Sequence, residues 1–223
     1  MLKKINTWQD AFDNDIDLWC YPKAKSADNI LLVARFHGDE PEGEFCLRKM
    51  LEELQNVDIS SSYNIYILPC LNPSGSKLKT RANGRGIDLN RNYPTENFTA
   101  ISVNPHTKEM SSGEPGSEIE TQIMMKIVQD YDIKRILSIH SDLYLIDYDG
   151  PAEILAKRFS DLCGYRLVDN IGYQTNGSFG TWAGVERKIP LITVETWHGE
   201  SQSDMMKIWH ELKPAIFDFC LLK

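Results

Sequence analysis

Short apolar runs alternate with segments of helical periodicity along most of this chain. Four runs of seven or eight residues, rich in Ile, Leu, Val and Tyr, lie at residues 30–36, 64–70, 133–140 and 189–196. Their length and composition predict strands that are buried within a sheet. Because helical patterns separate several of these runs, the chain is predicted to form an α/β sandwich with a mostly parallel or mixed sheet.

Apolar residues at helical spacing predict helices at residues 42–56, 151–164 and 203–222. Ser117 followed by Glu120 resembles a capping box and predicts the start of another helix, which continues through Val128. Pro214 is expected to kink or restart the last helix. Residues 71–117 show little periodicity and are rich in Asn, Gly, Ser and Pro, which is typical of a long loop that is either functional or disordered.

The composition excludes several classes of protein. A chain of 223 residues, 42% of them hydrophobic, is expected to form one globular domain over residues 1–223, although two small domains would also fit this length. The formal net charge of -8 disfavours a general nucleic-acid-binding surface, which needs a basic face. No apolar stretch resembles a signal peptide or approaches the roughly 20 residues that span a bilayer. A cytoplasmic protein without membrane contact is predicted.

Two histidines follow predicted strands, where ligands of open α/β sheets bind. His37 follows the first strand, with Glu40 three positions later, and His140 ends the third. Two histidines and one glutamate are a common ligand set of catalytic zinc sites, which leave a fourth position open for water. The alternatives are a polar turn after the first strand and a core histidine at position 140. The same HxxE spacing recurs from His106 to Glu109, where the loop composition favours an exposed segment without function.

Other charged residues would complete a hydrolytic site. Glu195 ends the last apolar run, where a carboxylate could take a proton from water and return it to a leaving amine. The alternative is an exposed glutamate at a strand end. Arg81, Arg85 and Arg91 lie within eleven residues of an otherwise acidic protein. Because arginine binds carboxylates through paired hydrogen bonds, this cluster predicts a pocket for a substrate with a free carboxylate, with a solvated loop as the alternative.

Five motifs together resemble the zinc carboxypeptidase family. They are HGDE at residues 37–40, NPSG at 72–75, TRANGRGIDLNRNYP at 80–94, SIHS at 138–141 and the late Glu195. They occur in the order of that family, between about residues 30 and 200. The resemblance implies a three-layer α/β/α sandwich with a central mixed, mostly parallel sheet, and a hydrolase that uses Zn2+.

The resemblance implies roles for the residues around the metal. His37, Glu40 and His140 would bind Zn2+, and Glu195 would be the general base. Asp88 would be a partner of His37 that orients its ring, as ligating histidines usually require.

The resemblance also implies how the substrate is held. Asn90 and Arg91 would bind its terminal carboxylate, while Arg81 would polarise the scissile carbonyl and stabilise the oxyanion. Tyr173, 22 residues before Glu195, would close over the substrate. Phe179 would lie near the floor of the side-chain pocket.

Residues 177–195 and the small size of the chain most resemble the bacterial murein peptide amidases. Those enzymes resemble carboxypeptidases that remove meso-diaminopimelate from L-Ala-γ-D-Glu-meso-diaminopimelate during peptidoglycan (cell-wall) recycling in the cytoplasm. A small murein tripeptide is therefore the expected substrate. Other murein stem peptides, L-peptides and N-acyl amino acids, the last as in the aspartoacylases, are the alternatives. A murein-peptide-binding protein without catalysis is the least favoured, and no feature predicts the oligomeric state.

Overall fold

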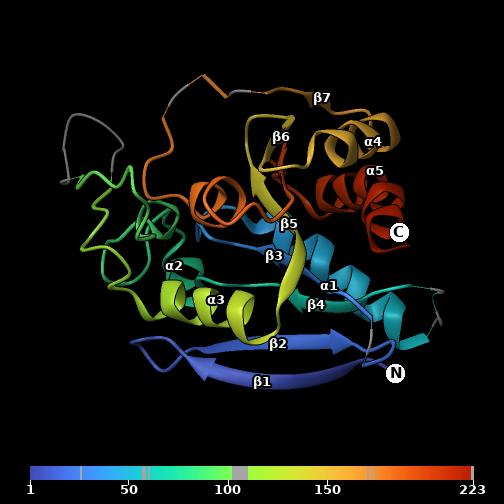
Figure 1. The fold of residues 1–223 in the computed structure, drawn as a ribbon, viewed down its shortest axis with the longest axis horizontal. Helices are drawn as coiled ribbons and strands as arrows, with labels where there is room; N and C mark the ends of the chain where they lie inside the picture. Colours follow the sequence, from blue (N-terminus) through green and yellow to red (C-terminus); the bar gives the residue numbers. More distant parts are fainter. Residues whose placement is uncertain are drawn as a thin grey trace.

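A computed structural model describes residues 1–25, 27–56, 59, 61–101, 110–169, 171–172 and 174–221. Eight strands of this part of the chain form one sheet in the order β1-β2-β4-β3-β5-β8-β6-β7 (Figure 1). The four strands β4, β3, β5 and β8 are mutually parallel neighbours, whereas β1, β2 and β6 each pair with a neighbour antiparallel. The prediction of a mixed, mostly parallel sheet is confirmed.

The strands are β1 (Lys3–Gln9), β2 (Asp15–Tyr21), β3 (Asn29–Ala34), β4 (Asn64–Leu68), β5 (Ile133–Ser141), β6 (Leu145–Asp149), β7 (Arg166–Leu167) and β8 (Leu191–Thr196). The α-helices are α1 (Pro41–Asn56), α2 (Pro73–Leu78), α3 (Ile119–Asp130), α4 (Glu153–Cys163) and α5 (Gln202–Leu221). A short 3₁₀ helix, η1, covers Leu89–Arg91, and a π-helix, η2, covers Gly180–Val185. The four strands expected from the apolar runs are all present.

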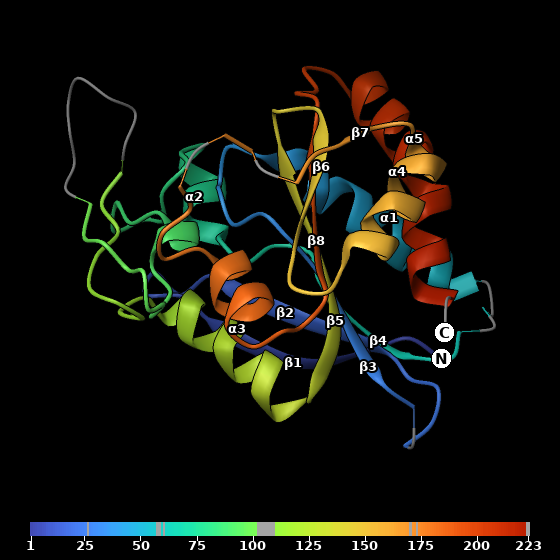
Figure 2. The same ribbon diagram turned by 45° about the horizontal axis from the view of Figure 1, so that its top comes forward.

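Two hydrophobic cores cover opposite faces of the sheet. In β3, Leu32 packs into one core and its neighbours Leu31 and Val33 into the other, because successive side chains of a strand point to opposite faces. The first core is closed by α1, α4 and α5, and the second by α3 and η2. Figure 2 shows α1, α4 and α5 on one side of the strands and α3 on the other. The expected three-layer α/β/α architecture is confirmed.

The start of α3 differs from the predicted capping box. The residue before the helix is Glu118, whose side chain makes no capping hydrogen bond. Ser117 instead donates its hydroxyl to Glu118 Oε1 and accepts a hydrogen bond from Asn92 Nδ2, while the Glu118 backbone N–H donates to Asn92 Oδ1. Asn92, from the loop beside η1, therefore binds the segment that enters the helix.

The last helix does not restart at Pro214. Pro214 lies inside α5, which is one helix from Gln202 to Leu221, while the expected kink stays a prediction. Within the described residues, no helix combines the length and the apolar character that a membrane crossing requires.

Candidate active site

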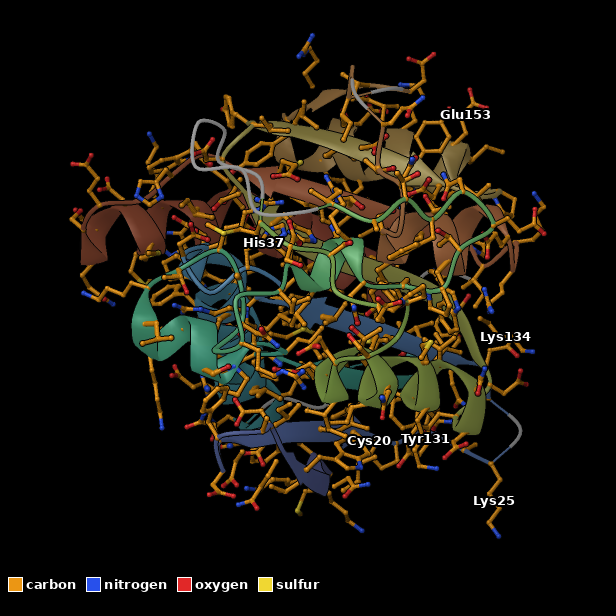
Figure 3. All side chains as sticks on the ribbon, turned by 90° about the vertical axis from the view of Figure 1, so that its left-hand side faces the viewer. Cys20, Lys25, His37, Tyr131, Lys134 and Glu153 are labelled. Carbon is orange, nitrogen blue, oxygen red and sulfur yellow. The ribbon has the colours of Figure 1, made fainter. Side chains whose placement is uncertain are left out.

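Three parallel strands bring the predicted site residues to one edge of the sheet. β3 ends at Ala34, and His37 follows three residues later. His140 is the second-to-last residue of β5. His140 is the register partner of Glu195 in β8. His37 lies inside the molecule, whereas Lys25, Lys134 and Glu153 lie at its outline (Figure 3).

His37, Glu40 and His140 form a buried cluster with the donor set of a catalytic zinc site. One potential ligand atom from each residue lies within 4.8 Å of the others. His37 Nδ1 is 2.6 Å from Glu40 Oε1, and His140 Nδ1 is 3.0 Å from Glu40 Oε2. Three converging ligands of this type, with a cavity beside them, fit a zinc ion that keeps one position open.

A close contact between two glycines shapes the turn that carries His37 and Glu40. A Cβ atom on Gly38 would lie 2.0 Å from the backbone carbonyl carbon of Gly75, so only glycine fits there. Asn72 strengthens the contact, because its Nδ2 donates to the Phe36 carbonyl and its Oδ1 accepts from the Gly75 N–H. The HGDE and NPSG motifs thus pack directly against each other, through Gly38 and Gly75.

Asp88 connects the histidine ligand with an arginine. One carboxylate oxygen lies 3.3 Å from His37 Nε2, and the other accepts a 2.9 Å hydrogen bond from Arg81 Nε. The Asn90 backbone N–H also donates to Asp88. Since Nδ1 of His37 faces Glu40, this arrangement holds the ring with its other nitrogen toward a carboxylate, as ligating histidines require.

The protein's own charges keep the two carboxylates beside His37 ionised. Burial by itself raises the pKa of Glu40 and of Asp88, but neighbouring groups together outweigh it and lower the pKa of both: His37 and His140 act on Glu40, and His37, Arg81 and Arg91 act on Asp88. Burial likewise lowers the pKa of His37, whereas the charges of Glu40 and Asp88 raise it, and they prevail. Two buried carboxylates beside two imidazoles provide an anionic environment that suits a divalent cation.

Glu195 lies beside this cluster, in the lining of the cavity that His37 and Glu40 also line. Burial, followed by the charge of Glu40, raises the pKa of Glu195 to about 8. A group that titrates near neutral pH is the most effective in proton transfer there. His198, three residues later, lines the same cavity.

A cavity of about 410 Å³ extends from the metal ligands. Arg81, Asn90 and Arg91 all line it, so the structure brings the residues expected to bind the substrate together with His37, Glu40 and Glu195. The Arg81 side chain is 33% exposed, and its Nη1 is 3.7 Å from Glu40 Oε1. Arg85, by contrast, points to the buried Glu118, with 3.7 Å between Arg85 Nε and Glu118 Oε2. It is not one of the described residues that line this cavity.

Two aromatic expectations have different outcomes. Tyr173 lies outside the described residues, as do His106 and Glu109 of the second HxxE motif. Phe179 is 2% exposed and packs against Phe36, so its ring belongs to the core. It is not one of the described residues that line the cavity. Its backbone N–H donates to Asn90 Oδ1, which leaves the Asn90 amide nitrogen available to the cavity.

The structure adds residues that the sequence did not reveal. Asp147 and Asp149 of β6 line the cavity, although the alternating pattern of their short strand was not predicted. Glu42 is fully buried and accepts hydrogen bonds from the Ser141 hydroxyl and the Gly199 N–H. It thereby links α1 to the segments that follow His140 and Glu195. The local sequence around Glu42 does not reveal this contact, because its partners lie 99 and 157 residues away.

Comparison with known proteins agrees with this geometry. The zinc carboxypeptidase family, peptidase M14, matches residues 14–152. Murein peptide amidase A of Escherichia coli (strain K12) is 32% identical over 190 residues, which cover 80% of this chain and 75% of that protein.

Solved structures share the fold. The crystal structure of murein-tripeptide amidase from Escherichia coli O157 has a TM-score of 0.76 at 26% identity, covering 96% of this chain and 91% of that chain. Carboxypeptidase A from Helicoverpa armigera has a TM-score of 0.76 at 15% identity, covering 99% and 68% respectively, and shows similarity of fold alone. From the family match and the identity to murein peptide amidase A, this chain belongs to the zinc carboxypeptidase family.

Proposed function

We propose that this protein uses zinc to hydrolyse the amide bond of a C-terminal amino acid, and that its substrate is the γ-D-Glu-meso-diaminopimelate bond of a murein tripeptide. The observation that carries the proposal is one cavity lined by Glu195, by the metal-ligand pair His37 and Glu40, and by the carboxylate-binding candidates Asn90 and Arg91. A substrate whose terminal carboxylate reaches Arg91 places its last amide bond between that residue and the metal ligands.

His37, Glu40 and His140 would hold the zinc, which when bound supplies a Lewis acid that polarises the scissile carbonyl and makes water more acidic. Glu195 takes a proton from the attacking water, and the same carboxyl group then delivers it to the leaving amine. The Arg81 guanidinium, fixed by Asp88, faces the cavity and stabilises the negative charge that develops on the carbonyl oxygen.

Asn90 and Arg91 define which bond is cleaved. Arg91 presents a planar donor group that matches a carboxylate, and Asn90 adds its side-chain amide. Because both are anchored on η1, directly after Asp88, the carboxylate site has a fixed distance from the metal ligands. We therefore expect the protein to cleave the bond to the terminal residue in preference to internal bonds.

The murein substrate follows from the relatives and not from the site alone. Proteins named murein peptide amidase A match most of this chain, as does a structure named murein-tripeptide amidase. We therefore assign to the protein a cytoplasmic role in cell-wall peptide recycling, carried out by one catalytic domain over residues 1–223. The same groups could also hydrolyse other stem peptides, L-peptides or N-acyl amino acids. The experiment below distinguishes these substrates from the murein tripeptide.

Mass spectrometry of the zinc-loaded protein with L-Ala-γ-D-Glu-meso-diaminopimelate tests the proposal. We expect free diaminopimelate and L-Ala-γ-D-Glu, and no product after treatment with a chelator. Intact tripeptide with a zinc-occupied protein would reject this substrate. Parallel reactions with an L-peptide and with an N-acetyl amino acid then identify the bond that the site cleaves.

A further inference from the structure

Two aspartates of β6 lie on the same face of the sheet as the general-base candidate. In the antiparallel pair of β6 and β8, Leu145 is opposite Glu195, Asp147 is opposite Thr193 and Asp149 is opposite Leu191. Every second residue of a strand points to the same face, so these side chains share one side. Asp147 is thus about 7 Å, and Asp149 about 14 Å, along the strand from the level of Glu195.

Both aspartates line the cavity, and in the part of the chain that the structure describes neither forms an ion pair with a cationic side chain. The charges that act on them come from other carboxylates: Asp169 on Asp147, and Asp147 on Asp149. Burial and then Asp147 raise the pKa of Asp149 to about 6. The arginines and the histidine that line this cavity beside the metal ligands face other groups: Arg81 pairs with Asp88, Arg91 donates to the Asn90 carbonyl, and His198 lies 3.0 Å from Glu42. A cation entering the cavity would therefore meet uncompensated negative charge at this end.

The position of Asp149 depends on two glycines of η2. A Cβ atom on Gly180 would lie 2.1 Å from Asp149 Oδ2, and one on Gly184 would lie 2.3 Å from the Asp149 Cβ. The absence of side chains at these two positions gives the carboxylate its place, and Gly180 itself lines the cavity. Asp149 is therefore held by a close fit against η2.

We propose that Asp147 and Asp149 determine substrate specificity by binding an ammonium group on the side chain of the released residue. This inference rests on the proposed function, because the residue must enter with its carboxylate toward Arg91 and its amide bond toward Glu195. Lysine and diaminopimelate share the required chemistry, because each carries a side-chain amino group five bonds from Cα; in diaminopimelate the carbon that bears it also carries the distal carboxylate.

The length of such a side chain fits the register. Five staggered bonds from Cα to the terminal nitrogen of lysine span about 6 Å. Asp147 lies about 7 Å along the sheet from Glu195, so the ammonium reaches the level of the aspartates while the amide remains at the base. A second cavity of about 400 Å³ also has Asp147 and Asp149 in its lining, together with Asn97, Gln174 and Asn176. Asp169 also lines it, which extends the acidic surface that the ammonium group would meet.

Calorimetric titration of the zinc-loaded protein with free lysine, norleucine and meso-diaminopimelate tests this inference. Norleucine matches the carbon chain of lysine and lacks the ammonium group. We expect the wild-type protein to bind lysine at least tenfold more tightly than norleucine, and Asp149→Asn to remove most of this difference. Asp147→Asn is a second variant of the same design, and Asp130→Asn, at the exposed end of α3, is the matched control.

The outcomes separate this inference from the proposed function. Equal binding of lysine and norleucine to the wild type, or an equal loss for both ligands in Asp149→Asn, would overturn the inference. Lysine selectivity in a protein that cleaves no peptide would reject the proposed function alone. Tighter binding of diaminopimelate than of lysine would show that the distal carboxylate adds contacts, whereas equal binding would assign recognition to the ammonium group.

Discussion

His140 and Glu195 are adjacent register partners in the parallel strands β5 and β8. The pairing places a metal-ligand candidate and the general-base candidate next to each other at the carboxyl ends of two buried strands, where the rigid sheet fixes their separation. His37 and Glu40, from the turn between β3 and α1, complete the group. A site built on neighbouring strand ends holds its catalytic groups in place without a ligand.

The first prediction concerns Glu195. Glu195→Gln keeps the size of the side chain and removes its ability to accept a proton, so we expect kcat to fall by at least a thousandfold. The zinc content, measured by elemental analysis, should be unchanged because Glu195 is not among the three clustered ligands. Glu200→Gln, an exposed control five residues away, should retain full activity. Substantial turnover by the Glu195 variant would transfer the role of base to another group.

The second prediction concerns Asp88, which lies between His37 and Arg81. Asp88→Asn preserves the shape but removes the charge that orients the imidazole, and we expect zinc affinity to fall by roughly 10- to 100-fold. Competition with a chromophoric chelator measures this change. An unaltered zinc affinity would mean that His37 keeps its orientation without the carboxylate.

The third prediction concerns recognition of the terminal carboxylate. Arg91→Ala removes a charged donor, and we expect kcat/KM for a peptide with a free carboxyl terminus to fall by about 10- to 100-fold, the cost of a hydrogen bond to a charged group. The same peptide with an amidated terminus should be a poor substrate for both proteins. If the variant still prefers the free carboxylate as strongly as the wild type does, another residue binds it.

Much of the architecture was predictable because the central strands are buried on both faces. β3, β5 and β8 appear in the sequence as continuous apolar runs, and the site residues follow directly from where those runs end. By contrast, β1 is largely exposed, and the cavity-facing aspartates interrupt the apolar pattern of β6. These two strands therefore lack the signal that identified the others.

Long-range contacts account for the remaining differences. Gly180 and Gly184 look unfavourable for a helix in the sequence, yet η2 needs them because Asp149 packs against both. The capping prediction for α3 was wrong because Asn92, 25 residues before Ser117, binds Ser117 and Glu118, which lead into the helix. Both features depend on contacts between residues that are distant in the sequence, and the local periodicity of the sequence carries no information about such contacts.

The fourth prediction concerns the contact between Gly38 and Gly75. Gly38→Ala would force a methyl group into the backbone of residue 75, and we expect the free energy of unfolding to fall by roughly 3 kcal/mol or more. Gly86→Ala is the control: its φ of 80° is unfavourable for alanine but its Cβ meets open space, so the loss should be only about 1–2 kcal/mol. Urea denaturation measures both, and equal losses would contradict the steric explanation.

The last prediction concerns the dependence of stability on pH. Because burial and Asp147 raise the pKa of Asp149 from 3.8 to about 6, the folded protein binds more protons than the unfolded chain between these values. Ionisation of Asp149 therefore costs stability, and the cost grows as the pH rises from about 4 through 6. Asp149→Asn removes it, and after allowance for partial solvent access we expect a gain of roughly 1 kcal/mol at pH 7.5, or a Tm about 2–4 °C higher.

The advantage of this variant should shrink as the pH falls toward 4, where the native carboxyl group is already neutral. Lysine selectivity over norleucine in the wild type should follow the same trend and rise between pH 5 and 7.5, because the ligand ammonium stays charged while Asp149 ionises. Thermal scans and titrations at the same pH values measure both trends, with Asp130→Asn as the control. If the stability difference between Asp149→Asn and the wild type is no larger at pH 7.5 than at pH 4.5, the surroundings do not destabilise ionised Asp149. The charge of Asp149 would therefore lower the free energy of unfolding and, at the same time, bind the ammonium group that sets the substrate specificity.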